Sequence, residues 1–157
     1  ADAIAAGLSA FRPESMAIAA GRLMLDRIQT LGAARMDFAF ETTLASRTFA
    51  RRLTVLRESS YRLHVAFLSL PSPDLAVARV AERVRAGGHD VPEPVIRRRF
   101  VSGLRNLFRQ YLDLADTWQV FDNSALAAPR LIAARMPGEG VRLIDADAWR
   151  NLLERSR

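Results

Sequence analysis

Apolar residues recur at helical spacing from Pro13 to about Leu31, and this pattern predicts a first helix. Proline suits the first turn of a helix, and Gly32 is a typical residue to end one. Ser46 and Ser72 each precede a further helical stretch as an N-cap residue. Four more helices are therefore predicted, at 46–59, at 72–86, from Pro92 to about Ala115, and from about Ala146 to Arg155.

Short apolar runs between these helices predict strands. "MDFAFE" at 36–41 is predicted to be a buried strand, and "YRLHVAFLSL" at 61–70 is continuously apolar near its end, as strands of parallel sheets are. "DTWQVFDN" at 116–123 predicts a third strand, and the residues on either side of "PGEG" predict a hairpin. Strands that alternate with helices indicate an α/β protein with a mostly parallel sheet, and we expect one domain over 1–157.

The ends of the predicted strands indicate where a ligand should bind, because open parallel sheets bind ligands outside the C-terminal ends of their strands. This rule selects "ETT", "SLPSP" and "DNS", which follow the three strands. The helix pair over about 72–115 begins at the same edge and carries six arginines within 79–100. So much fixed charge fits either a solvated helix face or a lid that grips phosphate.

Composition narrows the possible partners. The formal net charge of +6 favours an acidic partner, such as a nucleotide, a nucleic acid or a membrane surface. All 23 basic residues are arginine, so the abundance of arginine alone says little about function. The absence of cysteine excludes disulfides, and His64 and His89 lack metal-ligand spacing, so no metal site is expected on the protein's own ligands. No apolar run is long enough to span a membrane and no signal pattern is present, so we expect a cytoplasmic protein.

Four segments together resemble the zeta-toxin-like P-loop kinases, in the bacterial branch often labelled predicted ATPase. They are "ADAIAAGLSAFRPESMAIAAGRLM", "FAFETTLASRTF", "FLSLPSPDLAVARVAERVRAGGHDVPEPVIRRRF" and "DTWQVFDNS". The likeness covers nearly the whole chain in the right order, and "GGHDVP" with its flanking arginines is its most specific part. It implies a three-layer P-loop NTPase-like fold, with helices on both faces of a mostly parallel sheet and a helical lid at about 72–115.

The resemblance also implies an activity. Such kinases transfer phosphate from ATP, with Mg²⁺, to a hydroxyl of a small polar metabolite, classically the nucleotide-sugar UDP-N-acetylglucosamine, and a small antitoxin protein holds them inactive. In the family a strand and a G-x-x-x-x-G-K-[ST] loop come first, and the loop cradles the phosphates. This sequence has no lysine and no such loop. We therefore expect the C-terminal three-quarters of such a kinase, which lacks the N-terminal strands, binds ATP weakly or not at all, and transfers no phosphate. The missing first strand would lie between 36–41 and 62–68.

Site residues follow from the family motifs. Asp2 matches the general base that accepts the proton of the substrate hydroxyl, and Arg83 matches an arginine that neutralises charge on the transferred phosphate. Substrate contacts are implied for Arg12, Glu41 and Thr43. Phosphate or nucleotide contacts are expected for Arg79, His89, Arg97, Arg98 and Asn123. Because the strand-end rule and the motifs agree, we expect Glu41, Thr43, Arg83 and His89 to share one cleft.

Each of these residues also has a purely structural interpretation. Asp2 would be a disordered terminal residue and Arg12 an ordinary residue before a helix. Glu41 would cap the following helix, Arg83 would pair with Glu82 or Asp74, and His89 and Asn123 would belong to turns. Arg97, Arg98 and Arg99 span almost a full helical turn, so at least one of them should be solvated or salt-bridged. Trp118 and Trp149 are expected in the core.

Two other functions remain open from the sequence. The first is a non-catalytic binding or interaction module that has lost its phosphate-binding loop. The second is a basic nucleic-acid-binding protein, which only the net charge supports. Few aromatic residues accompany the arginines, and this counts against single-strand binding by base stacking.

Overall fold

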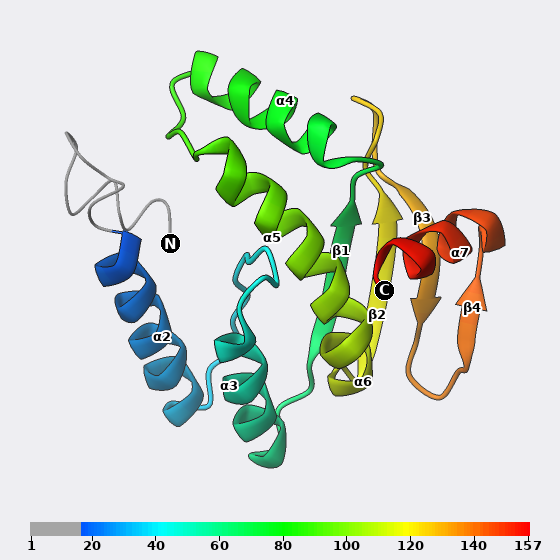
Figure 1. Ribbon diagram of the computed structural model, residues 1–157. Coiled ribbons are helices and arrows are strands. Elements are labelled where there is room, and N and C mark those ends of the chain that lie inside the picture. The colour runs from blue at the N-terminus through cyan, green and yellow to red at the C-terminus, as the bar shows by residue number, and fades with distance from the viewer. Residues whose placement is uncertain (1–16) are drawn as a thin grey trace. The chain divides into compact units, whose positions relative to one another are not determined.

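The computed structural model describes residues 17–157 of the chain (Figure 1). The chain forms two compact units. The described part of the first unit comprises residues 17–41 and 86–89, and the second unit comprises residues 42–85 and 90–157. Asp2 and Arg12 lie outside the described residues.

The first unit contains helix α2, Ala17–Ala33, which confirms the helix expected up to about Leu31 and extends it by two residues. Ala20, Met24 and Ile28 are buried and lie four positions apart, so they share one face of the helix.

The segment 36–41 after α2 is not a strand, and the prediction of a buried strand there is wrong. Its backbone pairs with no strand in residues 17–157, and most of its residues are exposed. Phe38 and Phe40 lie on the same side of the segment, with ring centroids 6.4 Å apart. The short apolar run predicted a buried strand, but a strand also requires a hydrogen-bonded neighbour, which this segment lacks among residues 17–157.

Every other helix expected from the sequence is present in the second unit. They are α3 (Arg47–Glu58), α4 (Pro73–Arg85), α5 (Glu93–Asn106) with its continuation through the π-helical turn η2 (Leu107–Tyr111) into α6 (Leu112–Leu114), and α7 (Ala146–Arg155). The expected N-caps are confirmed. The Ser46 hydroxyl accepts a hydrogen bond from the Thr48 amide, and the Ser72 hydroxyl accepts one from the Leu75 amide at 3.2 Å.

Four strands form one sheet in the order β1-β2-β3-β4: β1 (His64–Ser69), β2 (Thr117–Asp122), β3 (Arg130–Arg135) and β4 (Val141–Leu143). β1 and β2 are parallel, whereas β3 runs antiparallel to β2 and to β4. The sheet is therefore mixed rather than mostly parallel, because the correctly predicted β3–β4 hairpin contributes two antiparallel pairs and 36–41 contributes no parallel strand.

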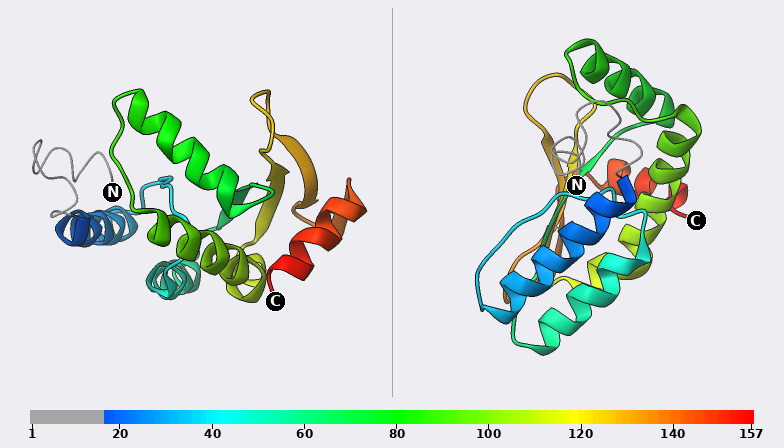
Figure 2. Two further views of the ribbon diagram at one scale, coloured as in Figure 1. Left: turned by 45° about the horizontal axis from the view of Figure 1, so that its top comes forward. Right: turned by 90° about the vertical axis from the view of Figure 1, so that its left-hand side faces the viewer.

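The helices of the second unit lie on one side of its sheet. Figure 2 shows α5 and α7 against the same face, and no helix of residues 42–85 and 90–157 covers the opposite face. The expected layer of helices on both faces is thus not present within this unit. β1 is an edge strand, because among residues 17–157 it pairs with β2 alone.

The core of the second unit lies between the sheet and these helices. Val120 and Ile132 from the sheet and Leu107 and Tyr111 from η2 are its largest fully buried side chains. Trp118 of β2 is also buried, and its ring stacks on Trp149 of α7 with centroids 5.5 Å apart. Both tryptophans therefore serve packing, as the sequence predicts.

Candidate functional site

The parallel strands β1 and β2 end side by side, as the strand-end rule requires. The amide of Asn123 donates to the carbonyl oxygen of Ser69 at 2.9 Å, so the residues after the two strands are neighbours. The next carbonyl, that of Leu70, accepts a hydrogen bond from the Arg155 guanidinium at 2.7 Å. Burial of this guanidinium lowers the pKa of Arg155. "SLPSP" and "DNS" therefore form one edge of the second unit.

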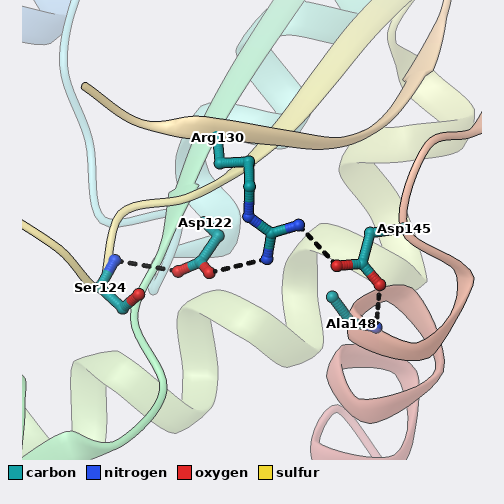
Figure 3. Close-up of polar contacts among 5 residues, drawn as sticks. All are labelled: Asp122, Ser124, Arg130, Asp145 and Ala148. Carbon is teal, nitrogen blue, oxygen red and sulfur yellow. Dashed lines mark hydrogen bonds and ion pairs between the residues drawn. The ribbon is translucent and has the colours of Figure 1, made fainter. Parts of the chain in front are cut away.

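An acidic side chain, Asp122, is fixed at the end of β2 (Figure 3). Its carboxylate accepts hydrogen bonds from the Ser124 amide at 2.9 Å and from Arg130 at 3.1 Å. Arg130 also donates to Asp145 at 2.6 Å, and Asp145 in turn caps α7 by accepting from the Ala148 amide. The three charged side chains of this network, Asp122, Arg130 and Asp145, are therefore all in ion pairs.

The pKa values of the two carboxyl groups, Asp122 and Asp145, follow from these contacts. Burial raises the pKa of Asp122, but its hydrogen bonds with Ser124 and Arg130 outweigh burial, so the pKa lies below its ordinary value. The hydrogen bond from the Ala148 amide, followed by that from Arg130, lowers the pKa of Asp145. Both carboxyl groups are therefore held as carboxylates, and neither is poised to exchange a proton near neutral pH.

The predicted lid is a pair of packed helices, α4 and α5, joined by an ion-pair network. Arg97 of α5 lies 2.7 Å from Asp74 of α4 and 2.7 Å from Glu93, one turn earlier in its own helix. The hydrogen bond to Glu93, and then that to Asp74, raises the pKa of Arg97. The expectation that at least one of the three successive arginines is solvated or salt-bridged is thus confirmed, and Asp74 pairs with Arg97.

Arg79 connects α4 to the edge formed by the strand ends. Its guanidinium donates to the carbonyl oxygens of Ser124 and Ala125, at 3.3 and 3.0 Å. α4 has no buried residue of its own, so polar contacts such as this one are prominent in fixing it. Arg79 therefore joins the lid to the loop after β2.

The remaining charged residues of the lid are exposed. Arg83 lies in the last turn of α4 and takes part in an interaction within the chain. Arg98 and Arg99 form no ion pair with any residue of 17–157. His89 belongs to the first unit, where it is half-buried and also has an interaction partner.

Glu41 and Thr43, which form an E-x-T motif in "ETT", are divided between the two units. Glu41 is exposed in the first unit, and Thr43 is exposed in the second. A cleft shared by Glu41, Thr43, Arg83 and His89 therefore stays a prediction.

The loop 42–46 is held by residues that the sequence analysis missed. The Asn106 side-chain amide donates to the Leu44 carbonyl oxygen at 2.8 Å, and the Tyr111 hydroxyl donates to the Ser46 carbonyl oxygen at 3.1 Å. Gly103 lies against the carbonyl of Thr43, where a Cβ atom would overlap the oxygen. A glycine and an asparagine inside a predicted helix were the available signal for this contact.

The described residues do not fit ATP and Mg²⁺. The sequence has no lysine to hold the β- and γ-phosphates, and no group of three His, Cys, Asp or Glu side chains in residues 17–157 could hold a metal ion. The fixed carboxylate of Asp122 is paired with Arg130. The edge formed by the strand ends thus offers a ligand backbone groups and hydroxyls, together with Arg79, Arg130 and Arg155, which are already hydrogen-bonded within the chain.

Among residues 17–157, no helix has both the length and the apolar composition needed to cross a membrane.

Comparison with known proteins identifies the family. The model of the Zeta toxin family matches residues 12–148, which is most of the chain. The chain is also similar to an uncharacterized protein of Haemophilus influenzae, with 24% identity over 99 residues that cover 63% of this chain and 71% of the relative. No solved structure matches this chain significantly. Because the family match covers the strand ends, the E-x-T segment and both lid helices, the chain belongs to the Zeta toxin family.

Proposed function

We propose that this chain is the substrate-binding and lid portion of a zeta-toxin-type phosphotransferase that acts on a hydroxyl of a nucleotide-sugar. The observation that carries the proposal is the family match over 12–148, which includes every proposed site residue except Asp2. Within the second unit, the exposed Thr43 and the arginine-bearing helices α4 and α5 provide hydroxyl and guanidinium groups suited to a phosphorylated sugar.

The proposed roles of the site residues follow from the family motifs and from the exposure of their side chains. Arg79 and Arg97 are bonded to carbonyl or carboxylate oxygens, so their first task is to hold the lid, and a phosphate would have to compete for them. Arg83, which also has an interaction within the chain, and Arg98 are exposed on the lid helices, and on that exposure they are proposed to contact phosphate directly. Glu41, Thr43 and Arg12 are proposed to bind the sugar, Asn123 and His89 to contact the nucleotide, and Asp2 to act as general base.

The proposal assigns no ATP site to this chain. A P-loop kinase binds its nucleotide mainly through the backbone amides of its G-x-x-x-x-G-K-[ST] loop and the lysine of that loop, and this sequence contains neither the loop nor a lysine. The lid arginines are point contacts on an exposed helix that must be ordered on binding. The chain alone should therefore bind phosphorylated sugars weakly and transfer no phosphate. An antitoxin-like protein remains a proposed partner on the family resemblance.

A non-catalytic interaction module is the second candidate, and one observation favours it. Within residues 17–157, β1 pairs on one side only and one face of the sheet has no helix of the second unit on it, an arrangement suited to a partner that adds a strand. In this case the chain would bind a protein and show no preference for nucleotide-sugars.

Activity of a fused protein separates the two candidates. A strand and a G-x-x-x-x-G-K-[ST] loop, joined in front of residue 1 as one polypeptide, should produce Mg²⁺-dependent ATP turnover that UDP-N-acetylglucosamine stimulates. In that fusion, Arg83→Gln should lower turnover far more than it weakens sugar binding, because Arg83 is proposed to act on the transferred phosphate. A fusion that folds and binds ATP but gains no turnover would favour the interaction module.

A further inference from the structure

The loop 42–46 has a strained backbone at its centre. Leu44 has a φ of +56°, a left-handed conformation that is unusual for a bulky residue, yet its side chain is buried. The Leu44 amide is bonded to the Thr42 hydroxyl at 3.2 Å, a local turn that fixes the chain on either side of Thr43. Such conformations persist only where the surroundings enforce them, and they concentrate at functional sites.

Three residues of the continuous helix α5–η2–α6 enforce this conformation. Asn106 is buried and donates to the carbonyl of the strained Leu44 itself, so its loss would leave a buried acceptor without a partner. The fully buried Tyr111 donates to the carbonyl of Ser46 at the far end of the loop. Gly103 allows the Thr43 carbonyl to approach the helix backbone more closely than any side chain would permit.

The π-helical turn η2 brings Asn106 and Tyr111 closer to the same side of the continuous helix α5–η2–α6. Asn106 and Tyr111 are five positions apart, which on a regular α-helix would place them about 140° apart around the axis. Hydrogen bonds of the i→i+5 type in Leu107–Tyr111 widen the turn, so residues five apart lie closer to the same side of the helix. The turn thus lets the Tyr111 hydroxyl reach the same loop as Asn106 and Gly103.

We propose that Gly103, Asn106 and Tyr111 are positioning residues that hold the Thr43 hydroxyl in place for the sugar of the substrate. This inference rests on the proposed function, because it takes the exposed Thr43 as a substrate contact. The three residues do not touch the ligand. They fix the carbonyls of Thr43, Leu44 and Ser46, which leaves the Thr43 side chain exposed on a rigid backbone.

The test compares Tyr111→Phe and Asn106→Leu with the natural chain, using NMR and titration calorimetry with UDP-N-acetylglucosamine. Both variants should shift the Thr43 amide and methyl signals, and both should raise the dissociation constant about three- to tenfold. Ser156→Ala is the matched control, since Ser156 is as buried as Asn106 and also donates to a carbonyl, that of Leu153 at 2.7 Å. The control should lose stability but keep its affinity for the sugar.

A double-mutant cycle then separates positioning from a general loss of structure. If Tyr111 acts through Thr43, Tyr111→Phe should cost no further affinity in a Thr43→Val background. Independent, additive losses of affinity would overturn the proposal, as would unchanged Thr43 signals in both variants. A natural chain that fails to bind the nucleotide-sugar would overturn the proposed function instead, and the Thr43 signals would still decide whether these residues set the loop.

Discussion

The guanidinium of Arg97 in α5 lies 2.7 Å from the carboxylate of Asp74 in the first turn of α4. Because α4 buries none of its residues, this pair and the contact of Arg79 with the Ser124 and Ala125 carbonyls are prominent among the bonds that fix the helix. α4 also packs on α5 and carries half-buried apolar residues such as Val80 and Val84, so the lid is held by this packing together with polar contacts at its surface. Such contacts can exchange partners at low cost, as a lid that closes on phosphate would need.

Arg97→Gln should loosen α4 without unfolding the protein. Exposed ion pairs contribute little to global stability, so the midpoint of unfolding should hardly change. Amide hydrogen exchange in 73–85 should accelerate by a few-fold, since local opening of α4 loses the contact. Arg98→Gln is the control, because Arg98 forms no ion pair with any described residue. Equal exchange rates in the two variants would contradict the importance of the pair.

Asp116 should make the free energy of unfolding depend on pH in the acidic range. Its carboxylate accepts from the Leu63 amide at 2.7 Å and from Arg57 at 3.2 Å, and these contacts, the amide first, lower its pKa from the ordinary 3.8. Because the folded pKa is the lower one, the stabilisation is complete above the unfolded value. It is lost as the pH falls through the folded value.

Asp116→Asn should therefore lower the free energy of unfolding by about 1 kcal/mol at pH 7, as this carboxylate is partly exposed. The difference between variant and natural chain should shrink below pH 3.8 and vanish at lower pH. Urea denaturation across this pH range measures it. The exposed Asp113 offers a control for the substitution itself, since Asp113→Asn should leave the free energy of unfolding at pH 7 almost unchanged. A difference that stays constant with pH would contradict the assignment.

Trp149→Ala should release α7 from the sheet. Trp149 stacks on Trp118 and lies 5.0 Å from the Phe108 ring, so its removal leaves a space between helix and sheet. We expect a loss of about 2–4 kcal/mol in the free energy of unfolding by urea, since the side chain is half-buried. Leu153→Ala, an exposed position on the same helix, should cost much less. Similar losses from the two variants would mean that stacking does not hold α7.

The unpaired edge of β1 should be visible in hydrogen exchange. Since β1 bonds to β2 on one side only among the described residues, about every second amide of His64–Ser69 should exchange rapidly. Strands paired on both sides, such as β2, should be protected throughout. Uniform protection of β1 would show that another strand, from this chain or from a second copy, covers the edge.

The sequence predicted those elements whose signals are local. Ser46 and Ser72 predicted the starts of their helices because an N-cap residue bonds to an amide within three residues of itself. "PGEG" predicted its hairpin because the turn sets how the two strands pair. The prediction for 36–41 was wrong because a short apolar run does not supply the neighbouring strand with which a strand must pair.

The candidate site was less predictable because its contacts span long distances in sequence. Asn106 and Leu44 are 62 positions apart, and Arg79 and Ser124 are 45 apart, so no local pattern relates them. Nor could spacing show which of Arg97, Arg98 and Arg99 would be paired, since that depends on where α4 brings Asp74. The π-helical turn that aligns Tyr111 with Asn106 has no simple sequence signal.

Titration calorimetry of the 157-residue chain tests the central claim most directly. With UDP-N-acetylglucosamine, the account predicts weak, saturable binding that Arg83→Gln weakens only slightly and Thr43→Val weakens clearly. With ATP and Mg²⁺ under the same conditions, it predicts weak or no binding, because the chain has neither the lysine nor the loop that holds the phosphates. Tight binding of ATP, or no binding of the nucleotide-sugar by a folded chain, would contradict it.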